Sequence, residues 1–243
     1  MEAKSGVFTI QRSGERFHAD HGWLNTYFSF SFAEYYDPKN LNWGALRVLN
    51  DDTVAPAAGF PTHPHKDMEI ITYVLSGQLD HKDSMGNHGV VGPGGIQYMS
   101  AGTGVRHSEY NASEKEPLHL VQMWLLPGRK GVKPSYGQLD YKVEDRRNKW
   151  LLVASGMPGD RAPVALTQQA AFRVARLENG VLDYAFAPGR LGFLFLAEGG
   201  LAANGSRLEA GDAVRLGGLP SLSLSGSGEV LLWDVPPTID VPA

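Results

Sequence analysis

Short apolar segments separated by glycine and proline constrain the fold of this 243-residue chain more than any other feature. Segments 69–75 and 118–126 are typical, because they are rich in β-branched and aromatic residues and are bounded by turn-forming residues. The 29 glycines and 15 prolines favour tight turns over long helices. The one helical signal, at 167–171, is too short for more than a turn or two. We therefore predict an all-β fold of the sandwich or barrel type.

The two halves of the chain share a pattern of strand, glycine turn and strand. The pattern around Gly77 recurs around Gly199, and the downstream turn at Gly94 recurs at Gly211. The second interval is shorter, so the second copy lacks a loop of about five residues. The repeat predicts two copies of one β-barrel.

A polar segment, 127–149, separates the two copies. It contains glycine, proline and a run of charged residues, a composition that is typical of a domain junction. We therefore predict an N-terminal domain at 1–138 and a C-terminal domain at 139–243.

Charge and cysteine content exclude several classes of function. The 26 acidic and 22 basic residues give a net charge of -4, and neither sign forms a block, so we expect no direct nucleic-acid binding. The absence of cysteine removes disulfide scaffolds, thiolate nucleophiles and iron–sulfur clusters. The N-terminus has no apolar signal segment, and no stretch approaches the roughly 18 apolar residues of a membrane span. We expect a cytoplasmic protein without a membrane partner.

All eight histidines lie at or before residue 119. His63 and His65 are two residues apart, and so are His107 and Glu109; residues two apart on a strand point to the same face. Two such pairs on neighbouring strands supply three imidazoles and one carboxylate, which suit Fe(II), Mn, Co, Ni, Cu or Zn better than Mg or Ca. Spacing alone also leaves Glu69, four residues beyond His65, able to face the same way.

Longer motifs around these residues carry a resemblance. Residues 59–69 and the run from Pro93 to His107 resemble the two motifs of the cupin superfamily. More narrowly, the chain resembles pirin and the pirin-like bacterial quercetinases over about residues 17–138, in motifs at 20–23, 29–32, 63–65, 81–87 and 97–109. The resemblance implies a bicupin, with two jelly-roll β-barrels in tandem.

The same resemblance implies a ligand set. His63, His65, His107 and Glu109 are expected to hold one divalent transition metal ion, Fe(II) first among the candidates. Many cupins take their carboxylate from the first motif, the position of Glu69, whereas pirins resemble this chain in offering it in the second. Glu109 is therefore the expected ligand, and Glu69 a supporting or structural carboxylate.

An activity is implied as well. Pirin-like quercetinases open the ring of a flavonol with O2 and release carbon monoxide, and Glu109 would act both as a ligand and as the base that takes the hydroxyl proton. Two alternatives stay open: a metal-loaded module that regulates a partner protein, as pirin does, and a cupin isomerase or hydrolase. Fold analogy does not separate them, because all three would use the same site.

Through the repeat, the four ligand positions correspond to Ala185, Ala187, Leu224 and Gly226. We therefore expect no metal site in the C-terminal domain. Its predicted role is packing, dimerisation or the binding of a protein partner.

The other histidines are expected to have supporting roles. His18 and His21 lie in a segment that could cover the barrel mouth, and we expect surface or hydrogen-bonding roles for them. His81 and His88 are expected at a solvated rim, and His119 as a hydrogen-bonded structural imidazole. Three aromatic residues are expected in the core or at a pocket: Tyr73, Tyr98 and Trp124.

Overall fold

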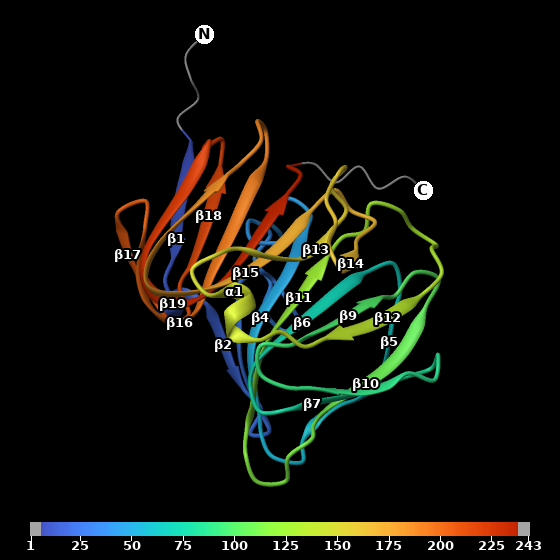
Figure 1. Ribbon diagram of the computed structural model, residues 1–243. Coiled ribbons are helices and arrows are strands. Elements are labelled where there is room, and N and C mark those ends of the chain that lie inside the picture. Colours follow the sequence, from blue (N-terminus) through green and yellow to red (C-terminus); the bar gives the residue numbers. More distant parts are fainter. Residues whose placement is uncertain (1–5, 238–243) are drawn as a thin grey trace. The chain divides into compact units, whose positions relative to one another are not determined.

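The computed structural model describes residues 6–237, and almost all of its regular structure is strand (Figure 1). The all-β prediction is confirmed. The described helices are α1 (Val143–Arg146) and the 3-10 helix η1 (Ser13–Glu15), and none among these residues has the length and apolar character needed to cross a membrane. Segment 167–171 contains no helix.

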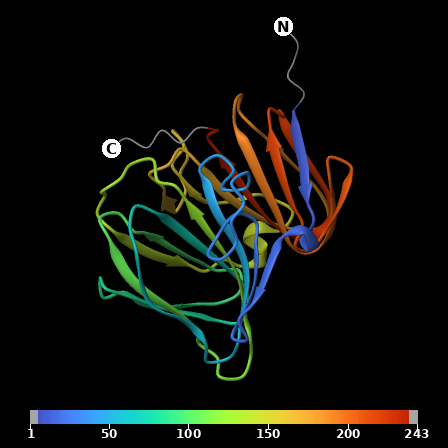
Figure 2. The same cartoon turned by 180° about the vertical axis from the view of Figure 1, so that it is seen from behind.

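The chain divides into two compact units. The N-terminal unit comprises residues 17–42 and 46–141, and the C-terminal unit comprises the described residues of 6–16, 43–45 and 142–237. This division departs from the expected domains at the start of the chain. β1 (Val7–Gln11) pairs antiparallel with β18 (Ala213–Gly217), and in both views the blue β1 lies among the orange and red strands (Figures 1 and 2). The outermost ends of the predicted domains lie outside the described residues.

Two sheets build the N-terminal unit. The larger has the strand order β12-β9-β6-β11-β4-β3-β2, and the smaller has the order β5-β10-β7-β8. The larger sheet contains β2 (Phe17–Asp20), β3 (Leu24–Phe28), β4 (Leu46–Val54), β6 (Glu69–Ser76), β9 (Ile96–Ser100), β11 (Leu118–Leu125) and β12 (Ser135–Leu139). The smaller sheet contains β5 (Gly59–His65), β7 (Leu79–Asp83), β8 (His88–Val91) and β10 (Val105–Asn111).

Apolar side chains from both sheets meet in the core of this unit. One cluster joins Val74 and Leu120 of the larger sheet to Leu79 and Val91 of the smaller sheet, all at most 1% exposed. The burial of such side chains removes apolar surface from water and is the main favourable term in folding. The two sheets are therefore layers around one core.

A single eight-stranded sheet builds the C-terminal unit. Its order is β1-β18-β16-β19-β15-β13-β14, with β17 paired to β16. The remaining strands are β13 (Leu151–Ser155), β14 (Val164–Ala165), β15 (Ala171–Ala185), β16 (Leu191–Ala203), β17 (Ser206–Glu209) and β19 (Ser221–Val235). Both halves of the long strands β15, β16 and β19 contribute side chains to one apolar core, so the sheet curls around it.

The backbone hydrogen bonds reproduce the internal repeat. The N–H of Gly94 donates to the carbonyl of Val74 at 2.8 Å, and the N–H of Gly211 donates to the carbonyl of Leu196 at 2.7 Å. Val74 and Leu196 each lie three residues before a matched glycine, Gly77 and Gly199, whose φ angles are 80° and 85°. The two units therefore share the local geometry that the repeat predicts.

The predicted match of His63 and His65 to Ala185 and Ala187 is wrong by one residue, at the end of β15. Ala185 is exposed and Ala187 lies beyond the strand and is also exposed, whereas Tyr184 and Phe186 turn toward the apolar core. Leu224 is fully buried in the same core. The inward positions of the C-terminal unit are thus occupied by apolar or aromatic side chains, which pack together and offer no imidazole.

We predict that Gly77→Ala lowers the free energy of unfolding by about 2–4 kcal/mol. The φ of 80° is unfavourable for alanine, and the new Cβ would lie 2.7 Å from the carbonyl oxygen of Pro117. Gly86→Ala tests the effect of φ alone, because Gly86 has a φ of 90° and no atom lies within 4 Å of the new Cβ. This variant should lose only about 1 kcal/mol of unfolding free energy. Gly137→Ala has neither problem and should stay within about 0.5 kcal/mol. Urea unfolding followed by tryptophan fluorescence measures all three; equal losses would contradict the explanation.

Candidate metal centre

The candidate metal centre is built on the pairing of β5 with β10. The register places His63 directly opposite His107, and an extra residue in β5 follows Phe60. Pro61 and Pro64 lack a backbone N–H, and β5 lies at the edge of its sheet, where a missing donor is tolerated. The edge position of the strand that carries the His-x-His pair is therefore compatible with its two prolines.

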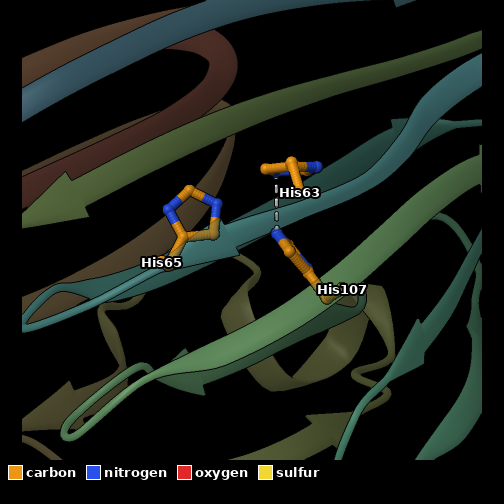
Figure 3. Close-up of side chains that lie close together, drawn as sticks. All are labelled: His63, His65 and His107. Atoms are coloured by element: carbon orange, nitrogen blue, oxygen red, sulfur yellow. Dashed lines mark hydrogen bonds between the residues drawn. The ribbon is translucent and has the colours of Figure 1, made fainter.

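Three imidazoles converge at this point, as Figure 3 shows for His63, His65 and His107, called here the histidine trio. Nε2 of His107 lies 3.1 Å from Nε2 of His63. One ring nitrogen from each member lies within 4.8 Å of the others. The structure thus brings together the three histidines singled out by their spacing.

Burial favours neutral imidazoles at two members of the histidine trio. Burial, followed by the neighbouring imidazoles, lowers the pKa of His65 to about 4 and that of His107 to about 3. Nδ1 of His63 donates to the carbonyl oxygen of Pro61 at 2.8 Å, and Nε2 is the nitrogen that faces His107. Two nitrogens at about 2.1 Å from one ion, at right angles around it, lie about 3 Å apart. The 3.1 Å separation in the trio therefore fits a shared metal ion.

The carboxylate of Glu109 accepts hydrogen bonds from two side-chain amides. Gln97 Nε2 donates to one oxygen at 2.5 Å, and Gln122 Nε2 donates to the other at 2.9 Å. Glu109 is buried, and a carboxylate has lone pairs to spare beyond two hydrogen bonds. Its oxygen lies within 4.8 Å of ring nitrogens of His81 and His107, in a second group that shares only His107 with the histidine trio. The role of Glu109 as a fourth ligand therefore stays a prediction.

His81 supports His107 from behind. The prediction of a solvated His81 is wrong, because the residue lies on the inward face of β7 and is fully buried, stacked on Tyr136 at 4.2 Å. Its Nε2 lies 3.3 Å from Asp83 and its Nδ1 lies 3.5 Å from Nδ1 of His107. If His81 donates to Asp83, it accepts from His107, which leaves Nε2 of His107 free for a metal. Such a partner typically fixes the tautomer and orientation of a ligand.

An apolar pocket of about 540 Å³ opens beside the histidine trio, within the size range of small-molecule sites. Its aromatic lining consists of Trp23, Phe28, Phe32, Phe60 and Trp124. Trp124 packs edge-on against His65 and against Phe32, with ring centroids 4.9 Å and 5.3 Å apart. The candidate ligand His65 and the aromatic wall are therefore continuous, which suits a flat aromatic ligand.

Polar residues on the wall of this pocket escaped the sequence analysis. Thr26, Asn50 and Asp52 line it, although Asn50 and Asp52 are each only 3% exposed. Burial raises the pKa of Asp52 to about 7, against the lowering effect of the hydrogen bond from Thr26. The sequence analysis also missed Gln97 and Gln122, whose amides donate to Glu109. For the two glutamines the available signal was a polar residue among apolar neighbours in a strand.

Glu69 lies apart from the candidate ligand groups. It is buried, accepts a hydrogen bond from the hydroxyl of Tyr98 at 3.2 Å, and belongs to neither candidate group of ligands. Tyr73 is 1% exposed and packs in the core. Of the three aromatic residues singled out by sequence, Trp124 lines the pocket.

Each of the four other histidines has a ring nitrogen near a side-chain oxygen. His18, His88 and His119 each place Nε2 within 3.2 Å of a side-chain oxygen. His21 lies 3.4 Å from Glu34 and lines the pocket. In the described part of the chain, both candidate groups of metal ligands belong to the N-terminal unit. This distribution agrees with a candidate centre in the N-terminal unit.

Comparisons with known proteins agree with this architecture. The chain matches the pirin family over residues 9–125 and the quercetinase C-terminal cupin domain over residues 152–235. It is 40% identical to a quercetin 2,3-dioxygenase of Escherichia coli over 94% of this chain and 98% of that protein. It is 47% identical to a pirin-like protein of Caulobacter vibrioides, over 80% of this chain and 84% of that protein.

A solved structure extends the similarity to three dimensions. The Escherichia coli bacterial pirin YhhW, in complex with nickel(II), aligns with a TM-score of 0.89 and 39% identity over 96% of this chain and 100% of that one. Fold, matched residues and identity lead to one conclusion: the chain belongs to the pirin family and has the bicupin fold, with a second cupin domain in its C-terminal half.

Proposed function

We propose that this protein is a metal-dependent dioxygenase of the quercetin 2,3-dioxygenase type, which opens a flavonol ring with O2 and releases carbon monoxide. One observation carries the proposal: His63, His65 and Glu109 line a pocket of about 540 Å³ with aromatic walls, and His107 lies 3.1 Å from His63. The quercetin 2,3-dioxygenase named among the relatives supports it.

We assign the metal to the histidine trio with Glu109 as the fourth ligand. When bound, the ion supplies the Lewis acidity and the contact with O2 that the reaction needs. Imidazole and carboxylate donors suit several divalent ions. We propose Fe(II) as the bound ion. The second candidate is nickel(II), the ion in the complex of the Escherichia coli relative.

The chain's own residues perform the other tasks. The aromatic rings of Trp23, Phe32 and Trp124 hold a flat substrate and exclude water from its face. Glu109 takes the proton of the flavonol 3-hydroxyl, and the amides of Gln97 and Gln122 fix the orientation of its carboxylate. Because these donors are in place beforehand, little reorganisation is needed when the substrate arrives.

The alternative is a metal-binding protein that acts through a protein partner. That function needs the metal ligands but not an apolar pocket beside them. The continuity of His65, Trp124 and Phe32 along the pocket wall is the reason why we place the dioxygenase first.

We predict that the double variant His63→Ala/His65→Ala loses the bound metal and lowers flavonol-dependent O2 uptake at least about 100-fold. The control is His18→Ala/His88→Ala, which removes two histidines of the same unit that lie outside the pocket. Metal content by mass spectrometry and O2 uptake with quercetin measure the two effects. Uptake that survives in the first variant refutes the site; no uptake by wild type with any metal refutes the dioxygenase.

Glu109→Gln should lower flavonol turnover by about 100-fold or more, because it removes a base and a charged ligand. Glu69→Gln is the matched control: it is also a buried carboxylate of the N-terminal unit, outside both ligand groups. Metal affinity and carbon monoxide release are measured on both variants. Loss of metal in the Glu69 variant alone would transfer the ligand role to Glu69.

His81→Phe should weaken metal binding about 10- to 100-fold, because it removes the nitrogen that faces His107. Phenylalanine keeps the ring that stacks on Tyr136, so packing is preserved. Asp83→Asn should have a smaller effect in the same direction. Metal affinity by competition with a chelator, and the 15N chemical shifts of His107, measure the change. Unchanged affinity and an unchanged tautomer of His107 would contradict the supporting role.

A further inference from the structure

One wall of the pocket is polar although it is buried. Asn50 and Asp52 point inward from β4 and are each 3% exposed, while other parts of the lining, such as Phe28 and Trp124, are aromatic. A buried polar group without a partner costs about 1–3 kcal/mol. Such a pair in the interior therefore calls for a physical explanation.

Asn50 has an acceptor that the chain leaves unused. Its Oδ1 is buried and has no hydrogen-bond partner within residues 6–237. Its cross-strand neighbours are Phe28, which has no donor to offer, and Gln122. The amide of Gln122 is already engaged, since its nitrogen donates to Glu109 and its oxygen accepts from Trp124. The unused acceptor thus lies next to the group that holds Glu109.

The carboxylate of Asp52 uses one of its two oxygens in a side-chain hydrogen bond. The hydroxyl of Thr26, its cross-strand neighbour, donates a short hydrogen bond to Oδ1. Its neighbour on the other side, Leu120, is apolar. Within the described residues the carboxylate of Asp52 makes no second hydrogen bond, so Oδ2 is available to a donor that enters the pocket. Burial also raises the pKa of this carboxyl, in keeping with its incomplete hydrogen bonding.

We propose that Asn50 and Asp52 form a subsite that accepts hydrogen bonds from two hydroxyl groups of an aromatic substrate. The inference rests on the proposed function and deepens it, because it names the substrate class: flat aromatic compounds that carry a pair of ring hydroxyls besides the 3-hydroxyl. Residues two apart on a strand lie about 6.6 Å apart. That spacing suits hydroxyls in a meta relation better than hydroxyls on adjacent carbons.

The first test compares ligands and needs no variant. Metal-loaded protein is kept under nitrogen and titrated with galangin (3,5,7-trihydroxyflavone), 3-hydroxyflavone and 3,3′,4′-trihydroxyflavone. Galangin differs from 3-hydroxyflavone only in its meta pair of hydroxyls, and the third compound carries adjacent hydroxyls instead. We expect galangin to bind at least about 10-fold more tightly than the other two, because unmet polar groups of a site disfavour an analogue that lacks the matching hydroxyls. Equal affinities overturn the proposal.

The second test removes the subsite. Asn50→Leu, and Asp52→Leu combined with Thr26→Val so that no hydroxyl loses its partner, should each reduce the preference for galangin, and all three changes together should bring it below about threefold. The control is Thr53→Leu, on the exposed face of β4. Asp52→Asn keeps an acceptor and should retain part of the preference. A preference that persists in the combined variant overturns the proposal, and circular dichroism verifies folding in each case.

Oxygen uptake with galangin, measured in air on the same samples, separates this inference from the proposed function. Selective binding without uptake supports the subsite and refutes the dioxygenase. Uptake without selective binding supports the dioxygenase and refutes the subsite.

Discussion

The register between β5 and β10 is the constraint on which the candidate metal centre depends. A shift of one residue would turn every side chain of β5 to the opposite face, and His63 would no longer face His107. The edge position of β5 is compatible with Pro61 and Pro64, and the extra residue after Phe60 adjusts the alignment of the strand. The metal centre is thus a consequence of strand pairing as much as of residue type.

Buried polar groups support one another around this centre. Gln122 connects Glu109 to Trp124, and His81 connects Asp83 to His107. In a poorly polarisable interior such hydrogen bonds are stronger than in water, and an unpaired member is correspondingly costly. The equivalent interior of the C-terminal unit has no need of such a network, because leucine, valine and phenylalanine fill it. The two units therefore share a backbone pattern but differ in what their interiors can bind.

Local patterns predicted much of the fold. Short apolar segments and glycine turns indicated strands, and the glycines matched by the repeat adopt nearly equal φ angles at equivalent hydrogen bonds. The pairing of β1 with β18 was missed, because a strand's partner depends on packing with residues about 200 positions away. The one-residue offset at Ala185 was missed for a similar reason, since the face that a strand buries depends on its neighbours.

The sequence by itself determined the donor types, the spacing of two within each pair and the confinement of histidine to the first half. These features depend only on residue identity and on the two-residue period of a strand. Tertiary structure alone decided that His81 is buried behind His107, that two glutamines hold Glu109, and that Asn50 and Asp52 face the pocket. Those contacts join strands far apart in the chain, and which strands become neighbours is settled by the packing of the two sheets around their common core.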